Sequence, residues 1–188
     1  MEEDKKEIIR KAATHIMARK GFYNTKASQI AEEAGIAVGT IYNYFNSKDD
    51  ILEYIFAVEL KKRYNYLKQL NDKDLMVMEK IETFLIKHFQ EIINSPDTGR
   101  ILVREKDFPR KMNQDYIADY LTKLPAMIMK MLDEAIANRE ISECNTEIIA
   151  AFIFGAIQGI VEKAINNNNI EILNDAAGEV INLLKNGL

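Results

Sequence analysis

The chain has 188 residues, is 47% hydrophobic and 29% charged, and has a formal net charge of −4, which is ordinary for a soluble globular protein of one or two domains. The single cysteine, Cys144, excludes an intrachain disulfide and a cysteine metal cluster, so a reducing cytoplasm is the expected location. We find no apolar run near the ~20 residues of a membrane span and no signal-peptide pattern in MEEDKKEIIRK, so no membrane partner is expected.

The first predicted helix spans residues 3–20. Ile8, Ala12 and Ile16 recur every four residues and make one side apolar, and Gly21 ends the helix. His15 lies in this pattern without a second ligand at metal-binding spacing. We interpret it as a residue at the edge of the core, and no metal site is predicted.

Two short helices with a tight turn between them are predicted within residues 25–48. The first covers residues 27–34 and is ended by Gly35, because glycine adopts the left-handed conformation that a helix end needs. The second runs from residue 38 to 44 or 45, with Ile41 and Phe45 facing the rest of the fold. Its outward side carries Gly39, Thr40, Tyr42, Asn43 and Tyr44. This pattern indicates a helix-turn-helix, whose second helix enters the major groove of DNA.

Charge is concentrated in the same part of the chain. Residues 5–48 carry eight lysines or arginines and three acids, a net charge of +5, whereas residues 51–188 carry a net charge of −4. DNA phosphates attract the local field rather than the mean charge of the protein, so this distribution favours DNA binding. The alternative is a solvated surface that happens to be uneven.

This stretch resembles the DNA-binding motif of the TetR family of bacterial transcriptional repressors. The resemblance covers about a quarter of the chain and many fixed positions at once. The matching residues are Gly21, Phe22, Thr25, Ile30, Ala31, Ala34, Gly35, Ile36, Gly39, Thr40, Tyr42, Tyr44, Phe45, Ser47 and Lys48. One position departs from the pattern: Ala37 stands where the family often has serine, so the second helix loses roughly 1 kcal/mol of side-chain capping.

A set of DNA-contacting residues follows from the outward face and the resemblance. We predict contacts from Thr25, Lys26, Ser28, Val38, Gly39, Thr40, Tyr42, Asn43, Tyr44 and Lys48. Thr25, Lys26, Ser28 and Lys48 are expected on phosphates. The helical wheel puts Val38 near the inward edge, but the family uses this position to touch bases, where valine suits a thymine methyl group. Residues 1–47 are therefore predicted to be a helix-turn-helix DNA-binding domain.

Residues 48–188 are predicted to form a helical ligand-binding and dimerisation domain. The expected helices are residues 48–70, 75–93, 98–106, 112–138, 146–165 and 170–185, with Ser47 capping the first and Pro125 kinking the fourth. No strand pattern is found. The predicted fold class is all-α, with a three-helix head joined without a linker to a helical bundle.

A ligand site is predicted in this second domain. Six of the eight methionines lie between residues 76 and 131, and methionine suits an adaptable apolar surface. The predicted ligand-binding residues are Phe84, Phe89, Arg100, Arg104, Arg110, Tyr116, Tyr120, Met127 and Met131. The arginines belong to a basic run at residues 100–111 that suits an anionic group. The alternatives are that the apolar residues only fill a core and that the basic run is a solvated face.

A dimer seam is predicted on the helix at residues 146–165. Ala151, Gly155 and Gly159 fall four residues apart, and small side chains let another backbone approach closely. The alternative is tight packing inside one subunit.

The resemblance implies a homodimeric repressor that binds a palindromic DNA operator and is released by a small apolar or amphipathic effector. A weaker resemblance, at scattered positions, to fatty-acid-responsive members of the family implies a fatty acyl-coenzyme A as that effector. The alternative function is a helical interaction module without sequence-specific DNA readout. No catalytic constellation or phosphate loop is found, so we expect neither an enzyme nor a bound cofactor.

Overall fold

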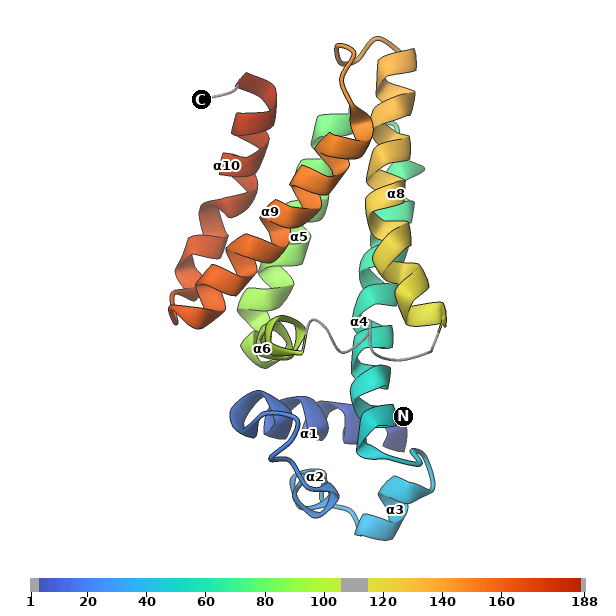
Figure 1. Cartoon of the computed structure of the whole chain (residues 1–188), viewed down its shortest axis with the longest axis vertical. Helices are drawn as coiled ribbons and strands as arrows, with labels where there is room; N and C mark the ends of the chain where they lie inside the picture. Colours follow the sequence, from blue (N-terminus) through green and yellow to red (C-terminus); the bar gives the residue numbers. More distant parts are fainter. Residues whose placement is uncertain (1–3, 106–114, 187–188) are drawn as a thin grey trace. The chain divides into compact units, whose positions relative to one another are not determined.

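The computed structural model of the chain describes residues 4–105 and 115–186, and the side chains of all of these except residues 115–121. The described residues form helices and no β-strand, so the predicted all-α fold is confirmed (Figure 1). The helices are α1 (Lys5–Lys20), α2 (Ala27–Glu33), α3 (Val38–Tyr42), α4 (Lys48–Asn71), α5 (Val77–Asn94), α6 (Pro96–Arg104), α8 (Asp115–Ala137), α9 (Thr146–Asn166), the 3-10 turn η1 (Ile170–Ile172) and α10 (Leu173–Asn186).

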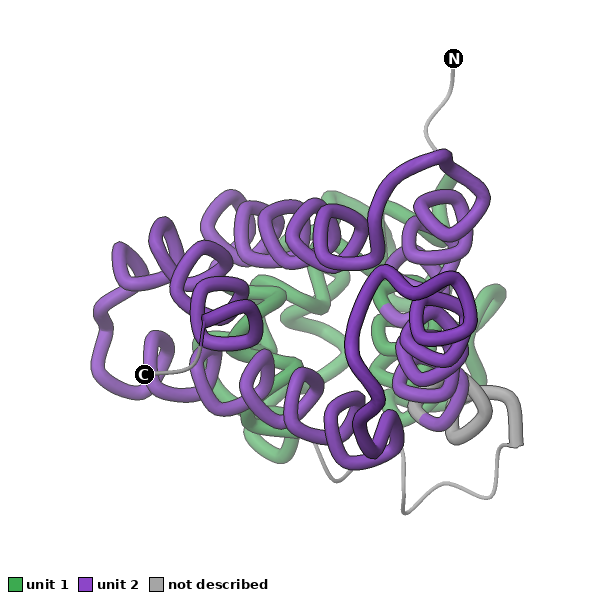
Figure 2. Tube along the Cα trace, turned by 90° about the horizontal axis from the view of Figure 1, so that it is seen from above, with its two compact units in different colours: residues 1–59, 97–117 green, residues 60–96, 118–188 purple. Residues whose placement is uncertain are grey.

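The chain divides into two compact units. Unit 1 contains residues 1–59 and 97–117, and unit 2 contains residues 60–96 and 118–188 (Figure 2). The dividing point therefore lies inside α4, and most of α6 belongs to the unit that contains α1 to α3. The predicted division after residue 47 concerns activity rather than compactness, and it stays a prediction.

Unit 1 is built around the apolar side of α1. Ala12 and Ile16 are buried, as the four-residue periodicity predicts, while Ile8 is half-buried. The most deeply buried residues of α1 are the neighbouring Ile9, Ala13 and Met17. Gly21 and Gly35 end α1 and α2 with φ angles of 78° and 64°, a left-handed conformation that costs glycine little. Both helix ends are therefore where the sequence predicts them.

The N-terminus of α4 is held by a local hydrogen-bonded cap. The Ser47 hydroxyl accepts the backbone N–H of Asp50 at 3.1 Å and donates to the Asp50 carboxylate at 2.6 Å. Hydrogen bonds from Ser47 and from Asn46 hold the pKa of the Asp50 carboxyl below its usual value. The predicted cap by Ser47 is confirmed, whereas Ala37, the N-cap residue of α3, provides no side-chain cap, also as predicted.

In unit 2, α5, α9 and α10 pack against one another (Figure 1). Asn145 caps α9 by accepting the backbone N–H of Ile148 at 3.1 Å. The last predicted helix, residues 170–185, is in fact the turn η1 followed by α10. The chain reverses before it through Asn168, whose φ of 51° is left-handed and is tolerated by asparagine.

One expectation about apolar runs is wrong. The helix α9 has 21 residues and contains an 18-residue window with a mean hydropathy of 1.8, so by length and composition it is long and apolar enough to cross a membrane. Only 28% of that stretch is buried within the chain. Much of this apolar surface is therefore left uncovered by the rest of the subunit.

Candidate functional site

The helix α3 presents the face that was predicted to meet DNA. Ile41 and Phe45 are buried, while Gly39, Asn43 and Tyr44 are exposed and 56% of Tyr42 is accessible. Thr40 is half-buried at the edge of this face. Val38 is exposed rather than turned inward, which suits the base contact that the family makes from this position. These residues form one short polar and aromatic surface on unit 1.

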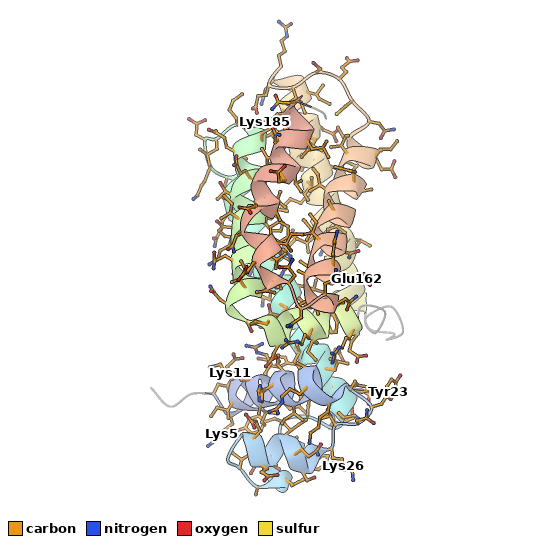
Figure 3. The ribbon with its side chains drawn as sticks, turned by 90° about the vertical axis from the view of Figure 1, so that its left-hand side faces the viewer. Lys5, Lys11, Tyr23, Lys26, Glu162 and Lys185 are labelled. Atoms are coloured by element: carbon orange, nitrogen blue, oxygen red, sulfur yellow. The ribbon has the colours of Figure 1, made fainter. Side chains whose placement is uncertain are left out.

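Lys26 and Ser28, at the start of α2, are also exposed. Tyr23 and Lys26 point away from the helices of unit 1, and Lys5 and Lys11 are labelled on the opposite side of these helices (Figure 3). Tyr23 was not predicted as a site residue, yet 83% of it is accessible. Its place in the short turn after Gly21 gives no clear signal for this exposure, because Phe22 in the same turn is only 5% accessible.

Thr25 has another role than the predicted phosphate contact. Its side chain is only 2% accessible, and its hydroxyl donates a hydrogen bond of 2.8 Å to the carbonyl oxygen of Gly21. Its backbone N–H donates to the Phe22 carbonyl at 3.2 Å. Thr25 therefore closes the turn between α1 and α2, and its hydroxyl is not presented to a phosphate.

Lys48 also has a different role in the structure. Its ammonium donates hydrogen bonds to the carbonyl oxygens of Phe22 at 2.7 Å, Thr25 at 2.9 Å and Tyr23 at 3.4 Å. It also lies 4.3 Å from the centroid of the Phe22 ring, a cation–π geometry. An ammonium has three donors, and all three have backbone partners here. A phosphate contact by this group would require one of these bonds to break.

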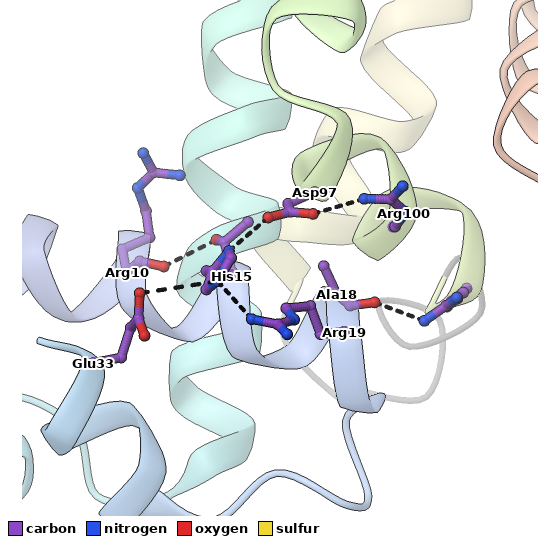
Figure 4. A network of polar contacts seen from close by, with 9 residues as sticks. Arg10, His15, Ala18, Arg19, Glu33, Asp97 and Arg100 are labelled. Carbon is purple, nitrogen blue, oxygen red and sulfur yellow. Dashed lines mark hydrogen bonds and ion pairs between the residues drawn. The ribbon is translucent and has the colours of Figure 1, made fainter. Parts of the chain in front are cut away.

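A polar network joins α6 to α1 within unit 1 (Figure 4). His15 Nδ1 lies 2.8 Å from the Asp97 carboxylate, and Asp97 also accepts a hydrogen bond from Arg100 at 2.8 Å. Arg19 and Glu33 approach the other ring nitrogen of His15, at 3.4 Å and 4.0 Å. His15 is half-buried, as expected of a residue at the edge of the core, and it also makes an interhelical contact. Among the described residues, no group of His, Cys, Asp and Glu is suited to hold a metal ion.

The basic run is only partly described, and its described arginines contact unit 1. Arg104 donates a hydrogen bond of 2.7 Å to the carbonyl oxygen of Ala18 on α1, and Arg100 is paired with Asp97. Both were predicted to bind the anionic end of an effector; the structure shows them engaged inside unit 1, where α6 packs, and the effector contact stays a prediction. Arg110 lies outside the described residues.

The apolar part of the predicted ligand site lies in unit 2. Phe84, Phe89 and Met131 are buried, and Met127 is half-buried. Tyr116 and Tyr120 belong to α8, but their side chains lie outside the described ones. Burial alone does not distinguish a ligand-lining residue from a core residue, so the apolar ligand site stays a prediction.

A buried polar pair in unit 2 was not predicted from the sequence. Arg63 on α4 and His88 on α5 are 6% and 9% accessible, and Arg63 Nε donates a hydrogen bond of 3.1 Å to His88 Nδ1. Burial, and then the positive charge of Arg63, hold the pKa of His88 well below its usual value. The helical spacing was the signal that could have found this pair. Arg63 falls between Leu60 and Leu67 on the buried side of α4, and a charged side chain is almost never buried without a partner.

The predicted seam residues face outward on α9. Ala151, Gly155 and Gly159 are exposed, and a Cβ atom added at either glycine would meet no heavy atom within 4 Å. Tight packing inside one subunit is therefore excluded as the reason for these glycines. Phe152 and Ile148 lie exposed nearby and extend the apolar surface.

Comparison with known proteins identifies the family of this fold. Residues 9–55 match the family model described as bacterial regulatory proteins, tetR family. The chain is 26% identical over 182 residues to the fatty acid metabolism regulator protein of Bacillus subtilis, covering 94% of this chain and 92% of that one.

Solved structures extend the likeness to the whole chain. The transcriptional regulator FadR from Bacillus subtilis in complex with stearoyl-CoA is 26% identical, with a TM-score of 0.85 and coverage of 97% of this chain and 98% of that one. The fatty acid degradation regulator FadR from Bacillus halodurans is 24% identical with a TM-score of 0.87, covering 100% of this chain and 98% of that one, and it supports the fold.

Proposed function

Because this chain belongs to the TetR family of bacterial transcriptional regulators, we propose that it acts as a homodimeric repressor that a fatty acyl-coenzyme A releases from a palindromic operator. The chain is a ligand-responsive DNA-binding transcriptional regulator. The observation that carries the proposal is the whole-chain likeness to a regulator solved with stearoyl-CoA, together with the exposed face of α3 on a basic unit.

The DNA-binding part of the proposal uses residues 1–47. The base-reading residues are Val38, Gly39, Thr40, Tyr42, Asn43 and Tyr44, with Lys26 and Ser28 on phosphates. A palindromic operator has two half-sites, one helical turn of DNA or a multiple of it apart, and each is read by one recognition helix. The second recognition helix must come from a second subunit, since helix-turn-helix proteins bind palindromes as two-fold dimers. The exposed apolar face of α9, with Ala151, Gly155 and Gly159, supports the contact between subunits.

The regulatory part uses residues 48–188. We assign the acyl chain to the region of Phe84, Phe89, Met127 and Met131 in unit 2. A ligand shifts the DNA-binding population only by its different affinity for the two states. The ligand-bound geometry therefore holds the two heads at a spacing that no longer matches the half-sites. A cytoplasmic location follows from the operator and from the intracellular source of acyl-coenzyme A.

An acyl-coenzyme A chain-length series, tested for release of the operator in a fluorescence anisotropy assay, tests this function. Each buried methylene contributes ~0.8 kcal/mol, so potency should rise with chain length to an optimum and then fall. No release by any chain length, combined with release by a flat aromatic or cationic compound, would assign the regulator to another effector class. Equal affinity for operator and random duplex would instead favour a helical module without sequence readout.

A further inference from the structure

The polar pair Arg63–His88 stands out within unit 2. Of the unit 2 side chains that the structure describes, these two are the only buried polar ones, and they contact each other. Burying the charge of Arg63 is costly unless it is paired and hydrogen-bonded, and apolar residues of similar volume often replace buried ionic groups with no loss of stability. A role in recognition is therefore a better physical reason for this pair than stability of the helical core.

The hydrogen bond between the two residues sets the donors that the pair presents. Arginine has only donors, so His88 Nδ1 accepts from Arg63 Nε and the imidazole proton is on Nε2. The imidazole is neutral, because burial and the guanidinium both hold the pKa of His88 well below its usual value. The pair thus combines a cationic guanidinium with a neutral N–H donor, and both favour an oxygen acceptor.

Aromatic rings lie beside these donors. The Phe84 ring is stacked on His88 with centroids 6.2 Å apart, and the Phe89 ring meets it edge-on at 5.5 Å. Phe84 and Phe89 are the residues to which we assign the acyl chain, and they flank His88 on α5. The polar pair therefore lies beside two of the aromatic residues to which we assign the acyl chain.

We infer that Arg63 and His88 bind the carbonyl oxygen of the fatty acyl group. This inference rests on the proposed function. It adds that the regulator recognises the carbonyl oxygen of the effector as well as its apolar chain. A carbonyl oxygen is common to an acyl thioester and a free fatty acid, and it accepts hydrogen bonds from both donors. In this arrangement the pair positions the head of the chain, and the apolar residues of unit 2 read its length.

The test compares palmitoyl-coenzyme A with S-hexadecyl-coenzyme A, a thioether that lacks the carbonyl oxygen, by isothermal titration of the full-length protein. A hydrogen bond involving a charged group corresponds to about a 10- to 100-fold change in affinity. The wild-type protein should prefer the thioester by that ratio. Arg63→Met and His88→Phe should each reduce this ratio, and the double variant should bind both compounds with equal affinity.

Two further variants separate recognition from folding. His88→Gln keeps an amide that can both accept from Arg63 and donate, so it should retain part of the preference. Lys62→Met removes the neighbouring exposed lysine on α4, which is paired with Glu91 at 3.0 Å, and should leave the preference at the wild-type ratio. The ratio of the affinities of one variant for the thioester and the thioether is unaffected by a general loss of stability.

The outcomes distinguish the inference from the function on which it rests. If wild-type protein binds thioester and thioether equally well, the carbonyl inference is wrong while the acyl-coenzyme A function stands. If neither compound binds, the acyl-coenzyme A function fails and the inference fails with it. Palmitate identifies the source of the carbonyl: binding that depends on Arg63 and matches palmitoyl-coenzyme A assigns the free acid, and weaker binding assigns the thioester.

Discussion

Lys48 Nζ lies 2.7 Å from the carbonyl oxygen of Phe22, so the first residue of α4 is tied to the turn between α1 and α2. The bonds to the Tyr23 and Thr25 carbonyls extend the same tie. In unit 1 this lysine therefore connects α4, which follows α3, to the turn that precedes α2. Its charge serves the internal geometry of the DNA-binding head.

Lys48→Met should therefore destabilise the protein and weaken operator binding without changing the salt dependence. The carbonyls lose a charged donor, which lowers the free energy of unfolding by about 1–3 kcal/mol. Each phosphate contact contributes about 0.9 to the slope of log affinity against log salt concentration. Thermal melts and anisotropy titrations at several salt concentrations measure both quantities.

Lys26→Met is the matched control, because Lys26 is exposed at the start of α2. It should lower the salt slope by about 0.9 and leave the melting temperature unchanged. A Lys48 variant that behaves in this way would show that Lys48 leaves its carbonyl partners and binds a phosphate in the complex.

Asn43→Ala should relax sequence preference. Asn43 is exposed at the C-terminal end of α3, and an asparagine that makes a bidentate contact with adenine discriminates bases by about 1–3 kcal/mol. Binding to a panel of single-base operator variants should show the loss at one position per half-site. A uniform loss at every position would mean that Asn43 contacts the DNA backbone.

His88 should make stability depend on pH in the acidic range. Its folded pKa is lowered, so below the ordinary histidine pKa of about 6.5 the unfolded chain binds a proton that the folded chain does not. The free energy of unfolding then falls as pH falls, by up to about 1.4 kcal/mol per pH unit for this one proton. Urea denaturation between about pH 7 and pH 5 should show a shallower dependence in His88→Gln than in wild type. Parallel curves for the two proteins would mean that His88 titrates in the folded state as it does in the unfolded chain.

Gly155→Leu should separate the subunits without unfolding them. A Cβ atom added at residue 155 meets no heavy atom within 4 Å, and leucine favours a helix over glycine by roughly 1 kcal/mol. In a close helix contact the same side chain overpacks the interface by roughly 1–3 kcal/mol. Sedimentation should show a cooperatively folded monomer that no longer binds the operator.

Gly155→Ala is the graded comparison, since it adds only a Cβ atom. It should shift the monomer–dimer equilibrium less than leucine does. A leucine variant that remains a dimer at the wild-type dissociation constant would place the seam elsewhere than on Gly155.

Several local features of the candidate site follow from sequence alone because they depend on residues close in the chain. The helix ends at Gly21 and Gly35 follow from backbone freedom, and the buried positions of Ile41 and Phe45 follow from helical periodicity. The cap by Ser47 is equally local. The family resemblance rests on the same stretch, and it implied the regulator class that the comparisons show.

Partners between helices were decided only by the tertiary structure. His15 meets Asp97 across 82 positions of sequence, and this contact places α6 beside α1 in unit 1. Arg104 thereby contacts Ala18, and Arg63 contacts His88 across 25 positions. Periodicity determines which face of a helix is apolar, but it contains no information about which other helix covers that face. The identity of a side chain's partner therefore depends on packing, and packing gives these charged residues roles that their sequence neighbourhood does not indicate.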